Sequence, residues 1–274
     1  MIAPLRGQPA TSKPWEGSRP WRGHRVTAII PTLEWSELLE LAVESLLLQT
    51  ERPLIVIVDT GSVETTAKLQ AMRARNSIEV LSIPLQGWIH PSEPVACALD
   101  AAWSCVHTQY AYLTHNDCIA KRRELIEEMV DLTAIHKAVG YRITERPYPE
   151  WVTELGHTCT MLDVKAMDLI GMTWNMRAFA NVTGQSLDPS FCGANKVDTE
   201  RFMNLKLRQA GIAPHFIGFE RNYERTNDEN IDHCRSRTSG LLYSPKHSVR
   251  AAAWEADAIT QSRLRHSAWS GSPC

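Results

Sequence analysis

Two acidic residues of this chain closely follow apolar runs, in positions where carboxylates can bind a ligand. Asp59 comes directly after the run at residues 54–58, and Asp117 comes shortly after the run at residues 110–114. Each run is typical of a buried strand. Polar groups that follow the strands of an open α/β sheet line its ligand site, although a single aspartate there can simply cap a turn. Together, the two aspartates predict a ligand site at one edge of a sheet.

The elements that would position these aspartates alternate along the chain. Short β-branched or apolar runs predict strands, and apolar residues at helical spacing predict helices between them. The predicted strands lie at residues 26–30, 54–58, 78–83 and 110–114, with helices near residues 38–47, 62–72 and 95–106. Beyond Asp117 the looser pattern predicts helices at residues 122–133 and 198–210, and strands at residues 139–143, 158–163 and 215–219. This alternation predicts an α/β fold with a mostly parallel, Rossmann-like sheet flanked by helices.

Length and composition restrict the class of protein. The 274 residues are 43% hydrophobic and 22% charged, as in an ordinary globular protein with one large domain. No apolar run approaches the roughly 18 residues of a membrane helix. The 7 cysteines include no CxxC pair, which argues against a disulfide framework or a structural zinc site, and a cytoplasmic protein is expected. The motifs GxGxxG and GxxxxGK(S/T) do not occur, so a dinucleotide dehydrogenase or a P-loop enzyme is not indicated.

Charge is distributed unevenly along the chain. Residues 1–25 and 235–274 each carry a net charge of +4, and because the whole chain carries −2, residues 26–234 carry −10. The first segment is also rich in proline and glycine. We therefore expect a basic N-terminal arm at residues 1–25, a central domain at residues 26–234 and a basic C-terminal extension at residues 235–274. An acidic body can bind a cation, whereas basic ends can meet a polyanion or simply be solvated.

Three segments carry a resemblance to a known family. They are Val26-Thr-Ala-Ile-Ile-Pro-Thr32, Ile55-Val-Ile-Val-Asp-Thr-Gly-Ser62 and Tyr110-Ala-Tyr-Leu-Thr-His-Asn-Asp117. Their order and spacing resemble family 2 glycosyltransferases with the GT-A fold, in which one strand ends in a Pro-rich turn, another in a VDDGS-like sequence and a later one in DxD. The resemblance covers about residues 26–219. It implies transfer of a sugar from a nucleotide-diphosphate sugar, with a UDP-sugar expected, to a hydroxyl group of an acceptor. Many family members that act on polysaccharide or lipid carry membrane helices, and because this sequence shows none, a soluble acceptor is expected.

The resemblance also implies a nucleotide site at the ends of the first two strands. In the family, the aspartate of the second strand binds the nucleotide, and this role would fall to Asp59. Pro31, Thr32, Glu34 and Asn116 are expected beside it.

The DxD motif of the family holds a divalent cation on the diphosphate, which implies Asp117 as a ligand of Mn²⁺ or Mg²⁺. Such a cation stabilises the charge that develops on the leaving group. His115 replaces the first Asp of DxD, and an imidazole suits Mn²⁺ or a softer metal better than Mg²⁺. His115 could instead be a hydrogen-bonding residue. His233 lies where many GT-A enzymes place a late histidine on the metal, although a lone histidine is more often structural.

The segment from Asp198 to Gly211 resembles the family's ED…LxLRLRxAG region, whose acidic residue is the general base. Counting back from Gly211 implies Glu200 as the base, with Asp198 as its rival. Residues two apart do not share a helix face, so only one of them is expected to enter the site. The base would take the proton of the acceptor hydroxyl, and a single displacement would invert the anomeric centre. The alternative is an acidic first turn that complements the helix dipole.

The sugar or acceptor pocket is expected to include His157, Thr158 and Trp88, although the strand at residues 158–163 could simply pack into the core. The motifs do not identify the acceptor. Basic residues 121–123 and the basic, Trp-containing ends raise a nucleic acid acceptor as a minority hypothesis, in which a hydroxylated base of DNA is flipped out of the duplex.

Two other functions stay open. The stretch Ala98-Leu-Asp-Ala-Ala102 lacks the arginine that the family often places there, so a catalytically silent relative could bind a sugar nucleotide without turning it over. A nucleotidyltransferase on a related fold would need a Gly-rich phosphate loop with an arginine after the first strand, and Pro31-Thr-Leu-Glu-Trp35 is not such a loop.

Overall fold

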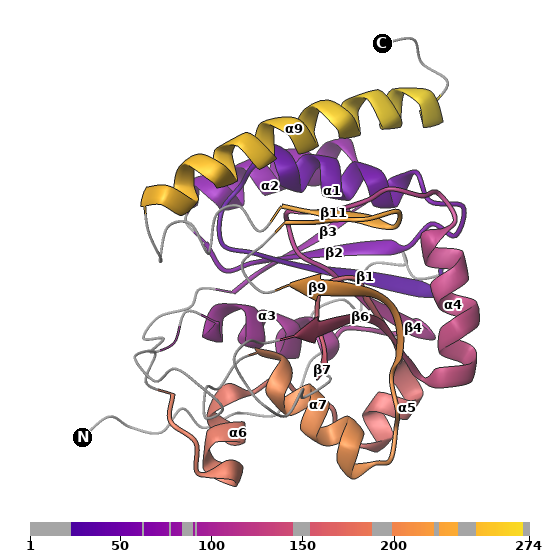
Figure 1. The fold of residues 1–274 in the computed structure, drawn as a ribbon, viewed down its shortest axis with the longest axis vertical. Helices are drawn as coiled ribbons and strands as arrows, with labels where there is room; N and C mark the ends of the chain where they lie inside the picture. The colour runs from indigo at the N-terminus through magenta and orange to yellow at the C-terminus, as the bar shows by residue number, and fades with distance from the viewer. Residues whose placement is uncertain are drawn as a thin grey trace.

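Among the residues that the structure describes, eight strands form one central sheet (Figure 1). This computed structural model describes residues 23–61, 63–76, 78–83, 90, 92–144, 154–187, 199–221, 225–234 and 245–270. The strands are β1 (Val26–Thr32), β2 (Leu54–Asp59), β3 (Ile78–Ser82), β4 (Tyr110–Leu113), β6 (Ala138–Thr144), β7 (Glu154–Leu155), β8 (Thr160–Asp163) and β9 (His215–Arg221). Their order is β3-β2-β1-β4-β8-β6-β7, with β9 paired to β6. Only β7 and β8 run antiparallel to their neighbours in this sheet, which confirms the predicted mostly parallel α/β fold.

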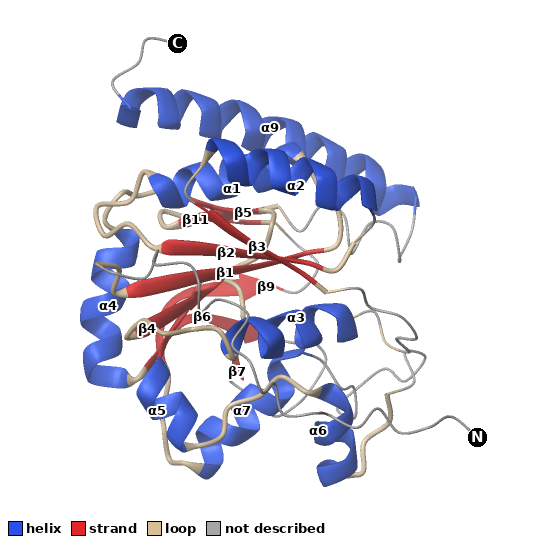
Figure 2. Cartoon of the chain, turned by 180° about the vertical axis from the view of Figure 1, so that it is seen from behind, coloured by secondary structure: helices blue, strands red, loops and turns tan. Residues whose placement is uncertain are grey.

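Helices cover both faces of the sheet (Figure 2). One face carries α1 (Glu37–Leu47), α2 (Val63–Arg75) and α4 (Leu125–His136), and the other carries α3 (Glu93–Trp103), α5 (Val164–Leu169), α6 (Met176–Thr183) and α7 (Thr199–Gln209). Successive side chains of a strand point to opposite faces, so each central strand contributes side chains to two hydrophobic cores. Ile30 and Ile57 pack into the core beneath α1, whereas Ile29 and Val56 pack into the core beneath α3. Because both faces are buried, these strands are continuous apolar runs in the sequence.

Two short helices and a second, smaller sheet were not predicted. The helices are α5 and α6, and the strands of the smaller sheet are β5 (Cys118–Ala120), β10 (Thr226–Asn227) and β11 (Ile231–His233). Strands of two or three residues are too short to show a periodic pattern. The strand predicted at residues 158–163 begins two residues later, as β8 at Thr160, and residues 157–159 form a loop before it.

A long helix, α9 (Pro245–Ser270), lies along α1 in the segment where only a basic extension was predicted (Figure 1). Its Ala258 is fully buried in a small apolar cluster with Leu38, Leu41, Ala42, Ile119 and Cys234. An ion pair between Arg263 and Glu37 and a hydrogen bond between Nδ1 of His266 and Glu44 (3.0 Å) flank this cluster. Helix α9 therefore covers α1 and part of the smaller sheet. The described residues contain no helix long and apolar enough to cross a membrane.

The packing of α9 can be tested at Ala258. The change Ala258→Asp would place an unpaired carboxylate in the apolar cluster, and we expect the free energy of unfolding to fall by about 3 kcal/mol or more. Ala256→Asp is the matched control, because Ala256 is exposed on the same helix, and its effect should stay within about 0.5 kcal/mol. Chemical denaturation measures both variants. Equal losses would show that α9 does not pack on α1 through Ala258.

Candidate active site

The loop after β4 meets the end of β1. This loop carries His115, Asn116 and Asp117, and β4 lies directly beside β1. The Nδ2 atom of Asn116 donates to Oγ1 of Thr32 (3.1 Å), and the Thr32 hydroxyl donates to the carbonyl of Glu34 (2.7 Å). Since β2 and β3 lie on one side of β1 and β4 on the other, the strand order reverses here, and open α/β sheets bind their ligands at such a point. The structure thus brings together Thr32, Glu34 and Asn116 of the predicted nucleotide site.

Asp59 lies along the same edge of the sheet, at the end of β2. Its buried carboxylate accepts hydrogen bonds from the backbone N–H of Gly61 (2.9 Å) and from the hydroxyl of Thr66 (2.5 Å). These bonds hold the turn into α2, as strand-terminal aspartates often do. The turn requires glycine, because a Cβ on Gly61 would lie 2.0 Å from the carbonyl oxygen of Leu33. Pro31 is buried within β1, and the nucleotide role of both Asp59 and Pro31 stays a prediction.

The smaller sheet brings His233 to the loop after β4. Strand β11 pairs with β5 so that His233 lies opposite Cys118, and the backbone N–H of Cys234 donates to the carbonyl of Asp117 (3.0 Å). The Nε2 atom of His233 lies 3.2 Å from Oδ1 of Asp117, and the rings of His115 and His233 are 4.9 Å apart. The three predicted cation ligands therefore come together, although they are far apart in the sequence.

His115, Asp117 and His233 have the spacing of a cation site. One potential ligand atom from each residue lies within 4.8 Å of the other two. Nitrogen and oxygen ligands sit about 2.0–2.2 Å from Zn²⁺ or a metal of similar size, so two of them on opposite sides of it are about 4.4 Å apart. The candidate ligand atoms here are separated by up to 4.8 Å, so the side chains would have to move closer together to hold one ion. With that adjustment, two imidazoles and one carboxylate can ligate a divalent cation.

Glu220 lies directly behind His233 and was not identified from the sequence. It is fully buried near the end of β9, and its Oε1 atom accepts a hydrogen bond from Nδ1 of His233 (2.6 Å). A carboxylate behind a ligating histidine fixes the ring and directs the other nitrogen to the metal. The sequence carries no signal for this role, since Glu220 looks like the polar end of a strand.

The histidines of the cluster differ in their tendency to carry charge. Burial lowers the pKa of His233, but the negative charges of Asp117 and Glu220 outweigh this effect and raise its pKa to about 9. Burial, followed by the neighbouring His157 and His233, lowers the pKa of His115 well below its ordinary value. One histidine of the cluster thus favours the charged form and its neighbour favours the neutral form.

His157 connects the cation cluster to the predicted base. Its Nε2 atom lies 2.6 Å from Nε2 of His115, and its Nδ1 atom lies 2.7 Å from Oε1 of Glu200. The two imidazole rings are stacked with their centroids 4.3 Å apart. His157 is therefore in the site, but between two predicted site residues. Thr158 is buried next to it in the same loop.

Helix α7 holds Glu200 in this position through its contacts with β7. The Oδ1 atom of Asn204 accepts from the backbone N–H of Leu155 (2.9 Å), and its Nδ2 atom donates to the carbonyls of Leu155 (2.8 Å) and Glu200 (2.9 Å). Arg201 forms a largely buried ion pair with Glu154 (3.1 Å). The first turn of α7 is thus fixed to the strand that leads to His157. The rival base Asp198 and the predicted pocket residue Trp88 lie outside the described residues.

The basic residues 121–123, which raised the nucleic acid hypothesis, are engaged within the chain. The Lys121 ammonium bonds the side chain of Asn227 and the backbone of Asp228, and Arg122 pairs with Glu128. Arg123 Nε donates to a backbone carbonyl of the α1–β2 loop (3.3 Å). Each of the three thus has at least one hydrogen-bond or ion-pair partner within the chain.

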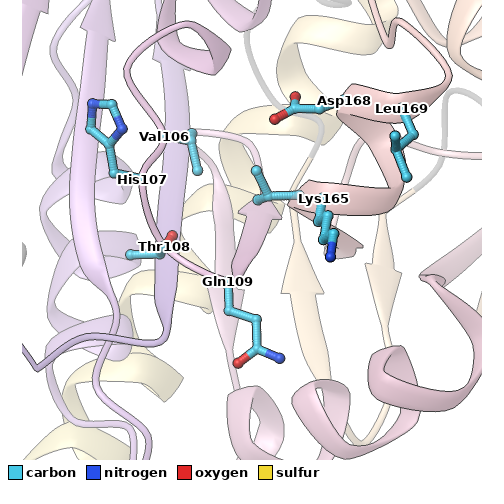
Figure 3. A pocket seen from close by; sticks show the side chains of 8 residues that line it. Val106, His107, Thr108, Gln109, Lys165, Asp168 and Leu169 are labelled. Carbon is cyan, nitrogen blue, oxygen red and sulfur yellow. The ribbon is translucent and has the colours of Figure 1, made fainter.

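A shallow hollow of about 480 Å³ lies away from the candidate site (Figure 3). It is lined by residues 106–109 and by Val164, Lys165, Asp168 and Leu169. Residues 106–109 precede β4, whereas His115 and Asp117 follow it. The hollow therefore belongs to the opposite edge of the sheet.

Comparison with solved structures identifies the type of fold. A mannosyltransferase from Pyrobaculum calidifontis, solved with GDP-Man and Mn²⁺, matches 94% of this chain and 77% of its own at a TM-score of 0.51 and 13% identity. The chain has a GT-A-type fold. Residues 1–349 of S. aureus TarS with UDP-GlcNAc match 89% of this chain and 73% of their own, with a TM-score of 0.47 and 11% identity. The 4-diphosphocytidyl-2C-methyl-D-erythritol synthase of Anaerococcus prevotii DSM 20548 matches 85% and 96% of the two chains, with a TM-score of 0.46 and 9% identity.

No family model matches the chain of this GT-A-type protein, and no curated protein matches it in sequence. At such low identity the likeness shows the fold alone. Membership of family 2 therefore stays a prediction.

The position of Glu200 can be tested through Asn204. The change Asn204→Ala would leave the buried backbone groups of Leu155 unpaired, and we expect a loss of about 1–3 kcal/mol in the free energy of unfolding. Gln209→Ala, at an exposed position of the same helix, should cost less than about 0.5 kcal/mol. Urea denaturation of both variants gives the comparison. Equal stabilities of the two variants would contradict the role of Asn204 in fixing α7 to β7.

Proposed function

We propose that the chain is a cation-dependent glycosyltransferase that moves a sugar from a nucleoside diphosphate sugar to a hydroxyl group of an acceptor. The observation that carries this proposal is the cluster of His115, Asp117 and His233 at the point where the strand order reverses. In a GT-A-type fold, a cation at this point would lie beside the residues expected to bind the nucleotide. The Pyrobaculum mannosyltransferase, which was solved with GDP-Man and Mn²⁺, supports both the donor class and the cation.

The ligand set favours Mn²⁺ over Mg²⁺. Mg²⁺ prefers oxygen ligands in a strict octahedral arrangement, whereas imidazole nitrogens suit Mn²⁺ and later transition metals. Two of the three ligands here are imidazoles. A bound divalent cation would stabilise the negative charge that develops on the leaving diphosphate.

The remaining steps fall to the chain's own side chains. Asn116 and Thr32, already joined by a hydrogen bond, would orient the nucleotide beside Asp59. Glu200 would accept the proton of the acceptor hydroxyl as its oxygen attacks the anomeric carbon. The new carbon–oxygen bond forms as the bond to the diphosphate breaks, and the nucleoside diphosphate leaves with that electron pair. A single displacement of this kind inverts the anomeric centre.

The test is calorimetric titration of UDP and of GDP into the protein, each with and without Mn²⁺. We expect one of the two nucleotides to bind with micromolar affinity only when Mn²⁺ is present. Asp117→Asn should weaken this binding at least about tenfold, because the cation loses its only carboxylate ligand in the cluster. Glu229→Gln is the control, since Glu229 is exposed.

Failure of both nucleotides to bind would overturn the proposed function. Binding without transfer to any acceptor, and without hydrolysis of the matching donor, would instead identify a catalytically silent relative.

Glu220 should affect cation binding although it is not one of the three ligands. Glu220→Gln keeps the shape of the side chain but weakens the acceptor that holds Nδ1 of His233. We expect Mn²⁺ to bind about 10–100-fold more weakly in this variant, as measured by titration with Mn²⁺ alone. If the variant binds Mn²⁺ as well as wild type and Glu229→Gln do, His233 does not depend on Glu220.

A further inference from the structure

The smaller sheet has two different faces, because successive residues of a strand point to opposite sides. Ile231 of β11 packs into the core of the main sheet, and His233 points the same way, toward Asp117. Ile119 of β5 points the other way and lies in one apolar cluster with Ala258 of α9. The smaller sheet is therefore a layer between α9 and the candidate cation site.

Arg225 joins this layer to α9. It lies directly before β10, and its side chain is only 10% exposed. Its Nε and Nη2 atoms donate to the two carboxylate oxygens of Asp232 (2.7 and 2.5 Å), and its Nη1 atom donates to Oδ2 of Asp257 on α9 (2.7 Å). All three guanidinium nitrogens are thus engaged, two by the smaller sheet and one by the helix. A two-bond contact of this kind fixes the orientation of the carboxylate as well as its distance.

Asp232 is the neighbour of the candidate ligand His233 in β11. Its side chain is only 1% exposed and points toward α9, whereas the side chain of His233 points into the site. The bonds from Arg225 therefore hold the backbone of β11 from the side opposite to the cation cluster. Ligand sites need their side chains to be held within about 0.5 Å of the correct position. A contact that fixes β11 thus also affects the cation site.

The docking of α9 is weakened by buried polar atoms beyond Ala258. Ser262 and His266 follow at helical spacing on the same face of α9, and Oγ of Ser262 and Nε2 of His266 are buried without a hydrogen-bond partner among the described residues. Buried polar atoms without partners cost free energy. The contacts of Arg263 and His266 lead to α1, whereas the contact through Arg225 leads to β11.

We propose that Arg225 is a positioning residue through which α9 sets the affinity of the candidate cation site. This inference rests on the proposed function, since it assumes that His233 ligates the cation. With α9 docked, Asp257 holds the guanidinium of Arg225, which in turn holds Asp232. When α9 moves away, Arg225 loses one of its three bonds and β11 is held less firmly. Displacement of α9 would therefore weaken cation binding.

The first test compares two ion pairs of α9 by titration of the full chain with Mn²⁺ alone. Asp257→Ala removes the contact with Arg225, and we expect Mn²⁺ to bind about threefold more weakly or worse. Arg263→Ala is the matched control, because it removes an exposed ion pair that leads to Glu37 on α1. This control should change the affinity less than about 1.5-fold. Equal effects of the two changes would overturn the coupling, because α9 would then act only as a cover.

The second test changes Arg225 itself. Arg225→Lys keeps the positive charge beside Asp232 but cannot form the two-bond contact, and we expect Mn²⁺ to bind about tenfold more weakly. Adding Asp257→Ala to this variant should alter the affinity by less than about 1.5-fold more, because the connection is already broken. Thermal unfolding confirms that each variant is folded. An undiminished effect of Asp257→Ala beside Arg225→Lys would contradict the role of Arg225.

The third test reads the coupling in the opposite direction, because linkage between two sites is reciprocal. Amide hydrogen exchange of the full chain is measured with and without Mn²⁺. We expect Mn²⁺ to slow exchange in α9 about twofold or more, while exchange in α6, on the other face of the main sheet, stays the same. In Asp257→Ala the effect on α9 should disappear. Unchanged exchange of α9 in wild-type protein that binds Mn²⁺ would show that the coupling is wrong.

The outcomes separate the coupling from the proposed function. If these tests fail while nucleotide binding still needs Mn²⁺, the coupling is wrong and the proposed function stands. Wild-type protein that binds Mn²⁺ but neither UDP nor GDP would overturn the proposed function, although the effects on α9 could still be observed. Wild-type protein that binds no Mn²⁺ would overturn both.

Discussion

The antiparallel pairing of β5 with β11 is the interaction on which the candidate site depends. It places His233 beside Asp117, and the bond from the N–H of Cys234 to the Asp117 carbonyl (3.0 Å) locks the two segments in register. Without it, the loop after β4 would carry only two of the three candidate cation ligands, His115 and Asp117. The smaller sheet is held in turn by α1, where the hydroxyl of Ser45 accepts from the backbone N–H of Ala120 (3.1 Å). Because α9 packs against α1, the candidate site rests on contacts that extend to the end of the chain.

Parts of the fold could be predicted because their physical signal is local. Strands β1 and β2 are buried on both faces, so every residue in them contributes to a continuous apolar run. Such a signal fails for β5 and β11, whose three residues each are stabilised by their partners and not by their own pattern. Helix α9 was also missed. Its apolar contact is a narrow stripe around Ala258, and the rest of the helix is alanine-rich and polar.

The candidate site, like the fold, could be predicted only in part. Asp117, His115 and His233 were found through a resemblance of short motifs, and the structure brings them together. The role of Glu220 could not be predicted from the sequence, because it depends on the pairing between β6 and β9 and not on any residue near it in the sequence. His157 was placed in the site but not between His115 and Glu200, since the contact depends on how α7 docks on β7. Partners that lie behind a ligand are set by tertiary packing, which a motif does not encode.

Charge balance explains why these residues occur together. Glu200, Asp117 and Glu220 are three carboxylates within one mostly buried network, and each of them meets a histidine. Buried carboxylates are costly unless positive charge or hydrogen-bond donors compensate them. A divalent cation would compensate two of the three negative charges, and Nδ1 of His233 is hydrogen-bonded to Glu220. The raised pKa of His233 has the same origin. The proton that His233 carries between Asp117 and Glu220 offsets the same two negative charges that a cation would offset. The network is therefore organised around positive charge at the edge where the strand order reverses.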